Sequence, residues 1–464
     1  MDNLRFYLVT WNVATRQPEE DVQEMLGLAK NTPQERLPDF YVVGLQEVKS
    51  QPQNMVMDAI FDDSWTNAFR QVLATHDYVK VKTIRLQGLL LSLYCLRKHL
   101  LHLRDIETQY TKTGFGGMWG NKGAVSIRLS IYGCSVCLVN CHLTPHDNLL
   151  QERITDYNTI IKSHTFQAKE TTNILFHDYV FWIGDMNFRL VDEPGVSLST
   201  DIEALVEKGE LTRLLEKDQL RRVMASGEAF SELVESTPTF PPTYKYEFHS
   251  SRYDHKRRPS WTDRILYKVN ANVYENLILN AEQISYKSYS GYMQSDHKPV
   301  IAEFIIKVFS DYYERVVEFD PIPTWYIEEE NFAMYTLSGD VEPTAWDWIG
   351  AYKDGFTSLD DYVCYVYAPR ALVMATPTSN SHHKRVNFPD TALRAPGRYR
   401  LLYFSHNSGS VLGMSQPFDV LNRDHGQITH FRITAVIIAA GWFIRWVSVR
   451  ILRLPKVLKL LGLV

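Results

Sequence analysis

An acidic and an amide side chain stand together at the end of an apolar run in the middle of the chain. Residues 181–183 are Phe-Trp-Ile, and Gly184, Asp185, Met186 and Asn187 follow them. Such a run is typical of a buried strand, and residues two apart on a strand share one face. Asp185 and Asn187 are therefore expected to point together into a cleft. Gly, Asp and Asn also form ordinary turns, so this segment alone leaves the turn as an alternative.

Other apolar runs also lead into side chains that phosphoryl chemistry could use. The runs at 6–9, 40–45 and 137–140 lead into Asn12, Glu47 and His142. Asp263 lies in the polar segment 259–264, and His297 lies in the segment 295–299, which opens another apolar strand. These placements predict one rim that collects catalytic groups from all along the chain. An interpretation based on packing alone has to treat each placement as coincidence.

Short motifs containing these residues occur in the order seen in one enzyme family. They are T-W-N, L-Q-E, W-G-N-K-G, N-C-H-L, G-D-M-N-F-R, P-P-T-Y-K, R-x-P-x-W-T-D-R-I-L and S-D-H-K-P-V, and they fall between residues 4 and 308. The chain resembles the inositol polyphosphate 5-phosphatases. The resemblance implies an α/β (α+β) two-sheet sandwich of the endonuclease/exonuclease/phosphatase type, flanked by helices, over residues 1–310.

The resemblance and the chemistry together suggest roles for these residues. A phosphate monoester is electron-rich, so its hydrolysis needs positive charge, alignment and a proton acceptor. We expect Asp185 to activate the attacking water and Asn187 to orient that water or the transition state. Glu47 is expected to bind Mg²⁺, which prefers hard oxygen donors. The resemblance implies a single ion, and the residues alone leave a second one open. By resemblance Asn12 supports the metal or the phosphate beside it, and Asp296 touches the metal directly or through water.

Histidines and cations complete the expected site. Asp263 is expected to orient His297 and favour its charged form, and His142 resembles the family's phosphate-contacting histidine. By resemblance, the phosphate next to the one removed is held by Tyr244, Lys245 and Arg257. This favours a substrate with a 4,5-bisphosphate head group. Another group frames the 5-phosphate or the metal: Lys122, His146, Arg153 and Arg189. Arg264 follows the paired Asp263 and could serve the site or the structure.

Composition sets the limits of these interpretations. With 464 residues, 45% of them hydrophobic, the chain can bury two cores. A net charge of −5 argues against a protein that coats nucleic acid. Between Lys245 and Arg264, however, six Lys or Arg face three Asp or Glu. This run is either a solvated loop or, between two motifs, an anion-binding wall. Five cysteines in apolar contexts and no N-terminal signal peptide favour a cytosolic protein.

After residue 311 the motifs stop and the pattern changes. Short aromatic-rich segments with regular turn signals predict a smaller all-β sandwich over 321–420, which resembles the SKICH domain and implies membrane or protein-partner targeting. Within the first domain, residues 201–222 have the apolar spacing of a helix.

The last segment, 421–464, has a different character. Residues 431–464 hold six Lys or Arg and no acid, and the apolar stretch 433–444 is short for a bilayer span of about 20 residues. A basic amphipathic helix on anionic lipid is one interpretation. An alternative terminus or an artefact of gene assembly is the other.

Three functions remain open from the sequence. The first is Mg²⁺-dependent removal of the 5-phosphate from phosphatidylinositol 4,5-bisphosphate and 3,4,5-trisphosphate, with soluble inositol phosphates as a secondary class. It implies a monomer that acts on a phosphoinositide-containing membrane without binding nucleic acid, peripheral to the endoplasmic reticulum and plasma membrane. The second is a nuclease of the same superfamily. The third is a non-catalytic adaptor acting through the second domain.

Overall fold

The computed structural model describes residues 2–28, 32–33, 36–49, 63–114, 117, 119–168, 171–270, 278–309, 316–338, 343–368, 372–373 and 382–423. The strands of the first domain are β1 (Asp2–Asn12), β2 (Phe40–Gln46), β3 (Tyr78–Leu86), β4 (Leu89–Leu96), β5 (Leu103–Gly114), β6 (Trp119–Ile131), β7 (Cys134–His142), β8 (Tyr179–Asp185), β9 (Asp263–Val269), β10 (Ala281–Ser288) and β11 (Val300–Val308). Its helices are α2 (Ser64–Ala74), α3 (Leu150–Ser163), α4 (Ser199–Glu207), α5 (Leu211–Leu215) and α6 (Gln219–Ser226), with the short 3₁₀ helices η2 (Arg97–His102) and η3 (Ile174–Phe176).

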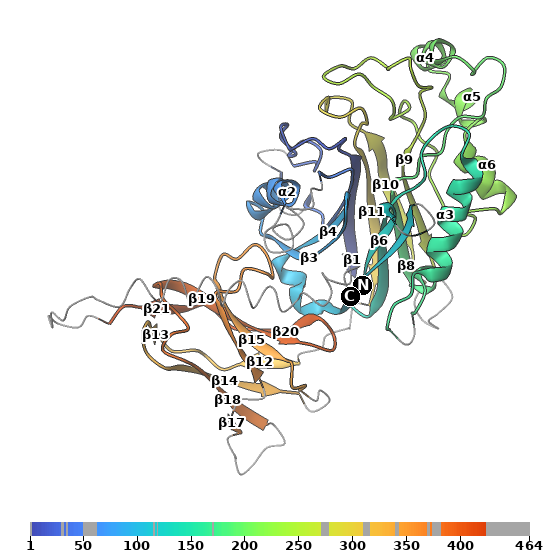
Figure 1. Ribbon diagram of the computed structural model, residues 1–464. Coiled ribbons are helices and arrows are strands. Elements are labelled where there is room, and N and C mark those ends of the chain that lie inside the picture. Colours follow the sequence, from blue (N-terminus) through green and yellow to red (C-terminus); the bar gives the residue numbers. More distant parts are fainter. Residues whose placement is uncertain are drawn as a thin grey trace.

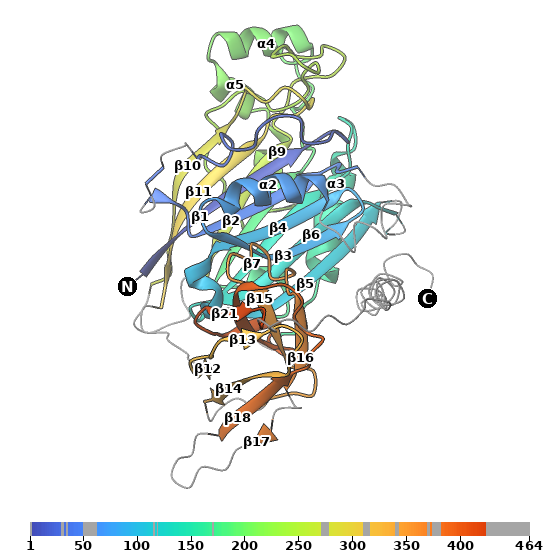
Figure 2. The same cartoon turned by 90° about the vertical axis from the view of Figure 1, so that its left-hand side faces the viewer.

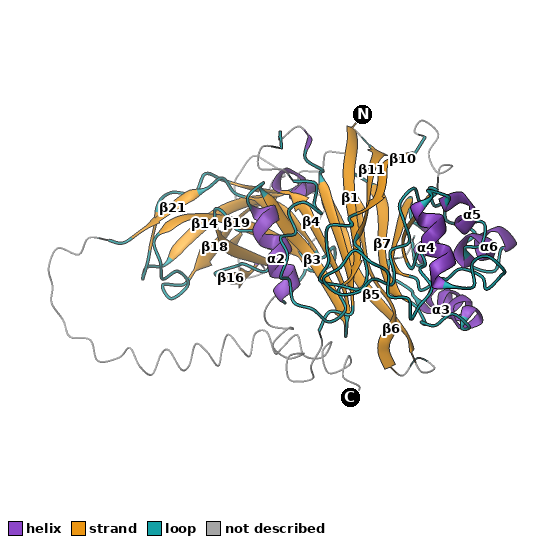
Figure 3. Cartoon of the chain, turned by 90° about the horizontal axis from the view of Figure 1, so that it is seen from above, coloured by secondary structure: helices purple, strands orange, loops and turns teal. Residues whose placement is uncertain are grey.

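Two sheets form the first domain. One has the order β10-β11-β1-β2-β4-β3 and the other β5-β6-β7-β8-β9. The helix α2 lies on the outer side of the first sheet, and α3 to α6 lie on the far side of the second (Figure 1, Figure 3). The central strands β2 and β8 are buried at every residue because layers cover both of their faces. This arrangement confirms the predicted two-sheet sandwich flanked by helices.

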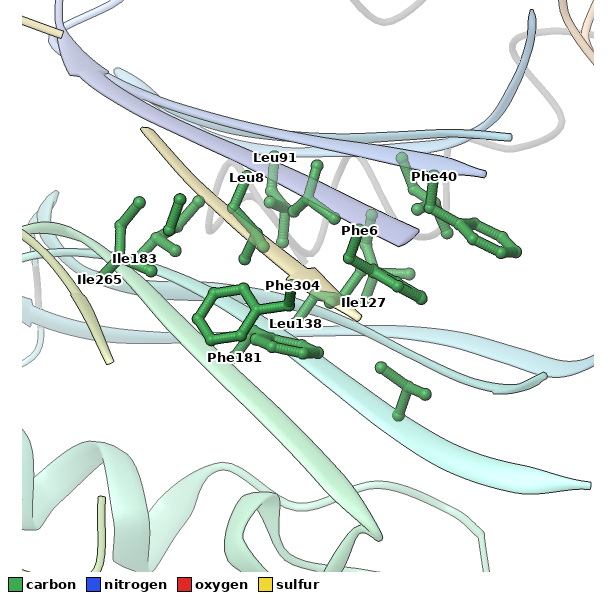
Figure 4. Packing of buried hydrophobic residues seen from close by; sticks show 14 of the residues in the cluster. Phe6, Leu8, Phe40, Leu91, Ile127, Leu138, Phe181, Ile183, Ile265 and Phe304 are labelled. Atoms are coloured by element: carbon green, nitrogen blue, oxygen red, sulfur yellow. The ribbon is translucent and has the colours of Figure 1, made fainter. Parts of the chain in front are cut away.

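Apolar side chains from both sheets fill the space between them (Figure 4). Phe6 of the first sheet stacks on Phe40 of its own sheet at 4.7 Å and on Phe181 of the opposite sheet at 5.7 Å between ring centroids. Phe304 packs on Phe181 at 5.0 Å. Aromatic contacts of this kind add to the free energy of area burial and fix how the two sheets face each other.

The strand directions explain why polar residues from distant motifs meet at one rim. Strands β1 and β2 are parallel, with Asn12 opposite Gln46, and β7 and β8 are parallel, with His142 opposite Asp185. Strand β9 is antiparallel to β8 and begins with Asp263 opposite Asp185. The ends of the parallel strands and the start of the antiparallel strand therefore lie at the same edge.

The predicted helix over 201–222 is wrong as a single element. The chain forms α4, α5 and α6 instead, and α4 ends before Gly209, whose φ of 72° is a left-handed conformation that stops a helix. Asp218 then accepts a hydrogen bond from the N–H of Arg221 and caps α6. The apolar spacing is helical, but these two local signals divide it.

The second domain is all-β, as predicted. Its strands are β12 (Val317–Phe319), β13 (Trp325–Tyr326), β14 (Asn331–Leu337), β15 (Trp348–Lys353), β16 (Cys364–Tyr367), β17 (Leu372–Val373), β18 (His382–Phe388), β19 (Gly397–Ser405), β20 (Ser410–Met414) and β21 (Phe418–Leu421). One sheet has the order β12-β14-β18-β17, and the other has β13-β21-β19-β15-β16 with β20 beside β19. Strand β12 precedes the expected start at residue 321 and pairs with β14.

The second domain packs directly on the first (Figure 1, Figure 2). Lys80 of β3 donates its N–H to the carbonyl of Thr357 at 2.8 Å and accepts from the N–H of Leu359 at 3.0 Å. Phe356 and Val411 belong to the same buried cluster as the core between the first domain's sheets. The contact includes η2, which follows the end of β4 that lies beside the start of β2. It is therefore at the opposite end of the sandwich from the rim.

Two buried histidines away from the rim are expected to make the protein sensitive to acid. His164 contacts the hydroxyls of Thr111 and Ser126, at 2.9 and 2.5 Å, and burial lowers the pKa of His164 to about 3 and of His177 to about 4. In the unfolded chain the pKa is about 6.5, so the unfolded state binds more protons between these values. Stability is therefore complete above pH about 6.5 and lost as the pH falls towards the folded pKa.

From pH 7 to pH 5 the free energy of unfolding should fall by about 2 kcal/mol for each of these histidines. Urea unfolding at both pH values measures this change. His164→Gln should lose its half of the dependence, and an unchanged dependence in that variant contradicts the assignment.

The five cysteines are free, and Cys134 and Cys137 point into different buried clusters of the first domain. Within the described ranges, no helix has the length and apolar character to cross a bilayer. The predicted basic tail, 421–464, lies outside the described residues apart from 421–423.

Candidate functional site

Asp185 is the centre of the rim. It is 1% exposed, and its Oδ2 accepts a hydrogen bond from the Asn12 amide at 2.9 Å. The same oxygen lies 3.3 Å from Nε2 of His142 and 4.0 Å from Nε2 of His297. Burial opposes the charge of Asp185, but His142, His297 and Lys122 outweigh it and hold the pKa of the carboxyl below its usual range. Asp185 is therefore an ionised carboxylate inside a ring of donors.

Gly184 allows this close packing. Its φ is 144°, and a Cβ there would lie 2.1 Å from the carbonyl oxygen of Cys141 on the neighbouring strand. Any other residue would push β8 away from β7, and Asp185 would move with it. Steric crowding therefore explains why the G-D-x-N motif has glycine at its first position.

The predicted geometry of Asn187 is wrong, although its place at the rim is as expected. Strand β8 ends at Asp185, and Asn187 has a φ of 56°, so the two residues do not share a strand face. The Asn187 N–H donates to Oδ1 of Asp185 at 3.1 Å, and its side chain binds the carbonyl of Leu143 and the guanidinium of Arg189. This turn holds Asp185 from behind.

His297 and Asp263 form the predicted pair. Nδ1 of His297 lies 2.9 Å from Oδ2 of Asp263, which also accepts from the hydroxyls of Thr243 and Thr262 at 2.7 and 2.8 Å. Burial lowers the pKa of His297, but the charge of Asp263 outweighs it and raises the pKa to about 9. His297 is therefore a cation at neutral pH that faces Asp185.

The pKa of His142 is shifted in the opposite direction from that of His297. Nζ of Lys122 lies 2.5 Å from Nε2 of His142. Burial, and after it the ammonium of Lys122, lowers the pKa of His142, and burial lowers the pKa of Lys122. The Lys122–His142 pair places hydrogen-bond donors next to Asp185, which suits an anionic substrate.

The predicted metal ligands are placed differently from one another. The Glu47 side chain is 42% exposed, and its Oε1 accepts from the Asn12 amide at 3.2 Å. Asn12 turns its amide nitrogen towards both carboxylates, while its oxygen accepts from the N–H of Ala14. Asp296 forms an ion pair with Lys245 at 3.3 Å. Glu47 thus has an accessible carboxylate, and Asn12 acts as a donor that joins Glu47 to Asp185.

A second cluster also has the spacing of a metal site. Potential ligand atoms of Asp185, Asp263 and His297 lie within 4.8 Å of one another. However, Asp263 already accepts from Thr243, Thr262 and His297. A half-exposed carboxylate such as Glu47 fits a magnesium ion better, because that ion keeps several waters and uses only one or two carboxylates.

The cations predicted to frame the 5-phosphate fall into two groups. Lys122 and His146 are at least partly exposed, whereas Arg153 and Arg189 are buried. The Arg153 guanidinium donates to the carbonyls of Thr144 and His146 and to Gln219, so it holds the loop after β7. Nη1 of Arg189 and Nε of Arg153 have no hydrogen-bond partner among the described residues, and each is a buried donor that an anion could take.

Residues 244–258 form one side of the site, which we call the basic wall. Tyr244 lies with its ring centroid 4.4 Å from that of His297 and 4.6 Å from the Arg189 guanidinium. Lys245 is partly exposed beside Asp296, and Arg257 is exposed. Two other arginines of the wall form ion pairs: Arg252 pairs with Glu247, and Arg258 pairs with Asp147. Lys256 is also exposed. Lys245 and Arg257 remain the accessible charges among those predicted.

Several supporting residues were not predicted. Ser295 donates to the carbonyl of Asn12 at 2.6 Å, and Trp11 donates to that of His297 at 3.0 Å. Gln46 donates to Asn140 at 2.7 Å across the two sheets directly behind the rim. Each of these residues adjoins or lies within one of the motifs. The motif positions next to the predicted catalytic residues could therefore have indicated them.

The open question about Arg264 is answered by its surroundings. Its side chain is completely buried, and its guanidinium pairs with Asp218 at 3.0 Å and Glu235 at 2.5 Å. It therefore joins β9 to the helical layer and has a structural role.

Comparison with known proteins places this fold and site in a family. Residues 9–303 match the Endonuclease/Exonuclease/phosphatase family 2, and residues 317–420 match the SKICH domain. The chain belongs to that phosphatase family. More narrowly, it belongs to the inositol polyphosphate 5-phosphatases, because it is 35% identical over 430 residues to inositol polyphosphate 5-phosphatase K of Mus musculus, covering 90% of each chain. This relative is the skeletal-muscle and kidney enriched inositol phosphatase, and the predicted resemblance to the inositol polyphosphate 5-phosphatases is confirmed.

Other similar proteins differ in length or function. Phosphatidylinositol 4,5-bisphosphate 5-phosphatase A of Homo sapiens is 35% identical over 90% of this chain, but the chain spans only 41% of that protein. The 5-phosphatase domain of SpSynaptojanin, solved with inositol (1,4)-bisphosphate and a calcium ion, is 30% identical with a TM-score of 0.55, covering 66% of this chain and 86% of that one. Cimex nitrophorin in its ferrous NO complex has a TM-score of 0.53 at 24% identity, covering 66% and 99%, which shows the fold alone. Function must therefore be argued from the rim.

Proposed function

We propose that the protein hydrolyses the 5-phosphate of phosphoinositides, with phosphatidylinositol 4,5-bisphosphate and 3,4,5-trisphosphate as substrates and soluble inositol polyphosphates as a secondary class. The observation that carries this proposal is the convergence of Asn12, His142 and His297 on the ionised carboxylate of Asp185. The names of the similar proteins support the substrate class.

The residues of the rim divide the work. Asp185 takes the proton of the attacking water, and Asn12 and Asn187 hold that carboxylate in place. His297, kept charged by Asp263, and the Lys122–His142 pair face the phosphoryl oxygens, which gain charge in the transition state. Nη1 of Arg189 is a further donor for the phosphate, and Arg153 and His146 shape the loop beside it.

Glu47 would hold Mg²⁺, with Asn12 beside it and Asp296 as a further ligand, directly or through water. When bound, the ion supplies charge neutralisation at the leaving inositol oxygen. Lys245 and Arg257, with Tyr244, would hold the 4-phosphate. With these assignments one pocket has cations for two adjacent phosphate groups, which favours a 4,5-bisphosphate head group.

The second domain would select the location of the enzyme. Its contact with the first domain lies away from the rim, so its outer surface is free to bind a protein partner while the rim faces a membrane. We propose a monomer that does not bind nucleic acid, located in the cytoplasm and peripheral to the endoplasmic reticulum and plasma membrane.

Phosphate release from a panel of substrates tests the activity. The full-length protein and a chain ending at 420 should both release phosphate from 5-phosphorylated lipids and soluble inositol phosphates with Mg²⁺ and not with excess chelator. Nicking of abasic DNA without phosphate release would instead support the nuclease. If the protein showed neither activity, the non-catalytic adaptor would be the remaining hypothesis.

The Mg²⁺ dependence gives a prediction for Glu47. Glu47→Gln should raise the Mg²⁺ concentration for half-maximal phosphate release by about tenfold, because an amide is a weaker ligand than a carboxylate. The exposed Glu207→Gln, on α4, is the matched control and should leave that concentration unchanged. A Glu47→Gln titration that overlays the wild-type curve argues against the assignment.

A further inference from the structure

A buried lysine lies behind the basic wall and takes no part in the proposed chemistry. Lys298 follows His297 and is 1% exposed. Its Nζ donates to the carbonyl of Tyr292 at 2.6 Å and lies 3.4 Å from that of Ser250. It also lies 4.6 Å from the centre of the Tyr246 ring. Within the described part of the chain its partners are carbonyls and a ring, not a carboxylate.

Such a group has a free-energy cost. Burying an ammonium is unfavourable when no carboxylate is in direct contact with it, and the charge of Glu20 offsets only part of this cost at Lys298. An apolar residue of similar volume often serves packing better. A lysine at this position therefore suggests a purpose that a hydrophobic side chain cannot meet. The purpose is visible in what the ammonium joins: Ser250 and Tyr246 belong to the basic wall, and Tyr292 belongs to the loop before the S-D-H motif.

Backbone hydrogen bonds run along the same contact. The N–H of Lys298 donates to the carbonyl of Thr243 at 2.9 Å, and the N–H of Tyr246 donates to that of Asp296 at 2.9 Å. The N–H of His249 donates to the carbonyl of Met293 at 2.8 Å. The first part of the wall, up to Ser250, is thus fixed to residues 292–298, and the lysine side chain is a polar link within that contact.

The inner side of the wall is rigid in another way. The rings of Tyr246 and Tyr253 stack at 4.4 Å, and both hydroxyls donate to the carbonyl of Pro242, at 2.9 and 2.8 Å. Movement at Lys298 would therefore shift the first part of the wall, including Tyr244 and Lys245 at its start.

We propose that Lys298 is a positioning residue that sets the distance between the basic wall and His297, and so determines the affinity for head groups that carry a phosphate beside the one removed. This inference rests on the proposed function. It assigns selectivity for the neighbouring phosphate to a residue that touches no substrate. Binding and hydrolysis of the phosphate that is removed depend on the rim itself.

Steady-state kinetics with two soluble substrates test the inference: inositol 1,4,5-trisphosphate and the analogue without the 4-phosphate. In Lys298→Met the KM for the trisphosphate should rise by about tenfold with kcat within about threefold, and the KM for the analogue should stay unchanged. Lys298→Gln keeps a donor for the carbonyls and should restore part of the affinity. Lys307→Met, at the other end of β11, is the matched control and should resemble the wild type.

The outcomes are distinguishable. Equal changes in KM or kcat for both substrates, accompanied by a lower melting temperature, overturn the positioning role and leave a structural one. If Lys298→Met does not fold, the KM ratio of Lys298→Gln decides the question, and a wild-type ratio rejects the inference. A wild-type protein that hydrolyses neither these substrates nor phosphatidylinositol 4,5-bisphosphate rejects the proposed function instead. If it hydrolyses the lipid alone, the same KM comparison is made with phosphatidylinositol 4,5-bisphosphate and the lipid without the 4-phosphate.

Discussion

Replacing Asp185 with asparagine should reduce kcat for phosphate release by about 10³-fold while the protein stays folded. The carboxylate is the proposed proton acceptor, and Asn12, His142 and Asn187 all direct donors towards it. An amide of the same size cannot take a proton from water. It would also turn its own NH₂ group towards one of these donors.

The control for this variant is Asp192→Asn, which makes the same chemical change at a side chain that is 72% exposed near the site. It should retain the wild-type kcat, and both variants should keep the wild-type melting temperature within a few degrees. If the Asp185→Asn enzyme kept more than about a tenth of the wild-type kcat, Asp185 would not be the general base.

The second large effect is expected from Asp263→Asn, which should reduce kcat by about 10²-fold and change its pH dependence. Burial disfavours the charge of His297, and Asp263 is the partner that raises its pKa to about 9. In the wild type the charged form is present below that pH and lost as the pH rises through it, so activity should fall above about pH 9. Without the carboxylate the pKa falls, and the alkaline limb should move to lower pH.

A pH–rate profile of both enzymes measures this shift, and histidine NMR can assign it to the ring of His297. Thr262→Val removes only one of the donors to Asp263. It should give a smaller loss in the same direction. An alkaline limb that stays in place in Asp263→Asn would show that His297 does not need its charge.

The part of the site that could be predicted follows from strand direction. Asn12, Glu47, His142, Asp185 and Asp263 stand at or next to strand ends, and the parallel and antiparallel registers bring such ends to one edge. The apolar runs identify the strands. The order of the strands along the chain is then enough to predict that these residues meet at one rim. The confirmed two-sheet fold and the all-β second domain have the same origin.

The part that could not be predicted depends on backbone turns and long-range partners. The left-handed turn at Asn187 follows from the packing of Leu143 and Arg189 around it. The burial of Arg153 depends on two carbonyls of another loop. Lys80, where the second domain pairs with β3 through backbone groups, has no side-chain pattern that marks it. Such contacts are invisible in residue types and spacing.

The most direct measurement is hydrolysis of phosphatidylinositol 4,5-bisphosphate by the full-length protein with Mg²⁺ in ¹⁸O-labelled water, followed by identification of both products. We expect phosphatidylinositol 4-phosphate without label and inorganic phosphate that carries one atom of it, with neither formed by Asp185→Asn. Loss of the 4-phosphate, label in the lipid product, or the same yield from Asp185→Asn would contradict a rim in which Asp185 directs water at the 5-phosphorus.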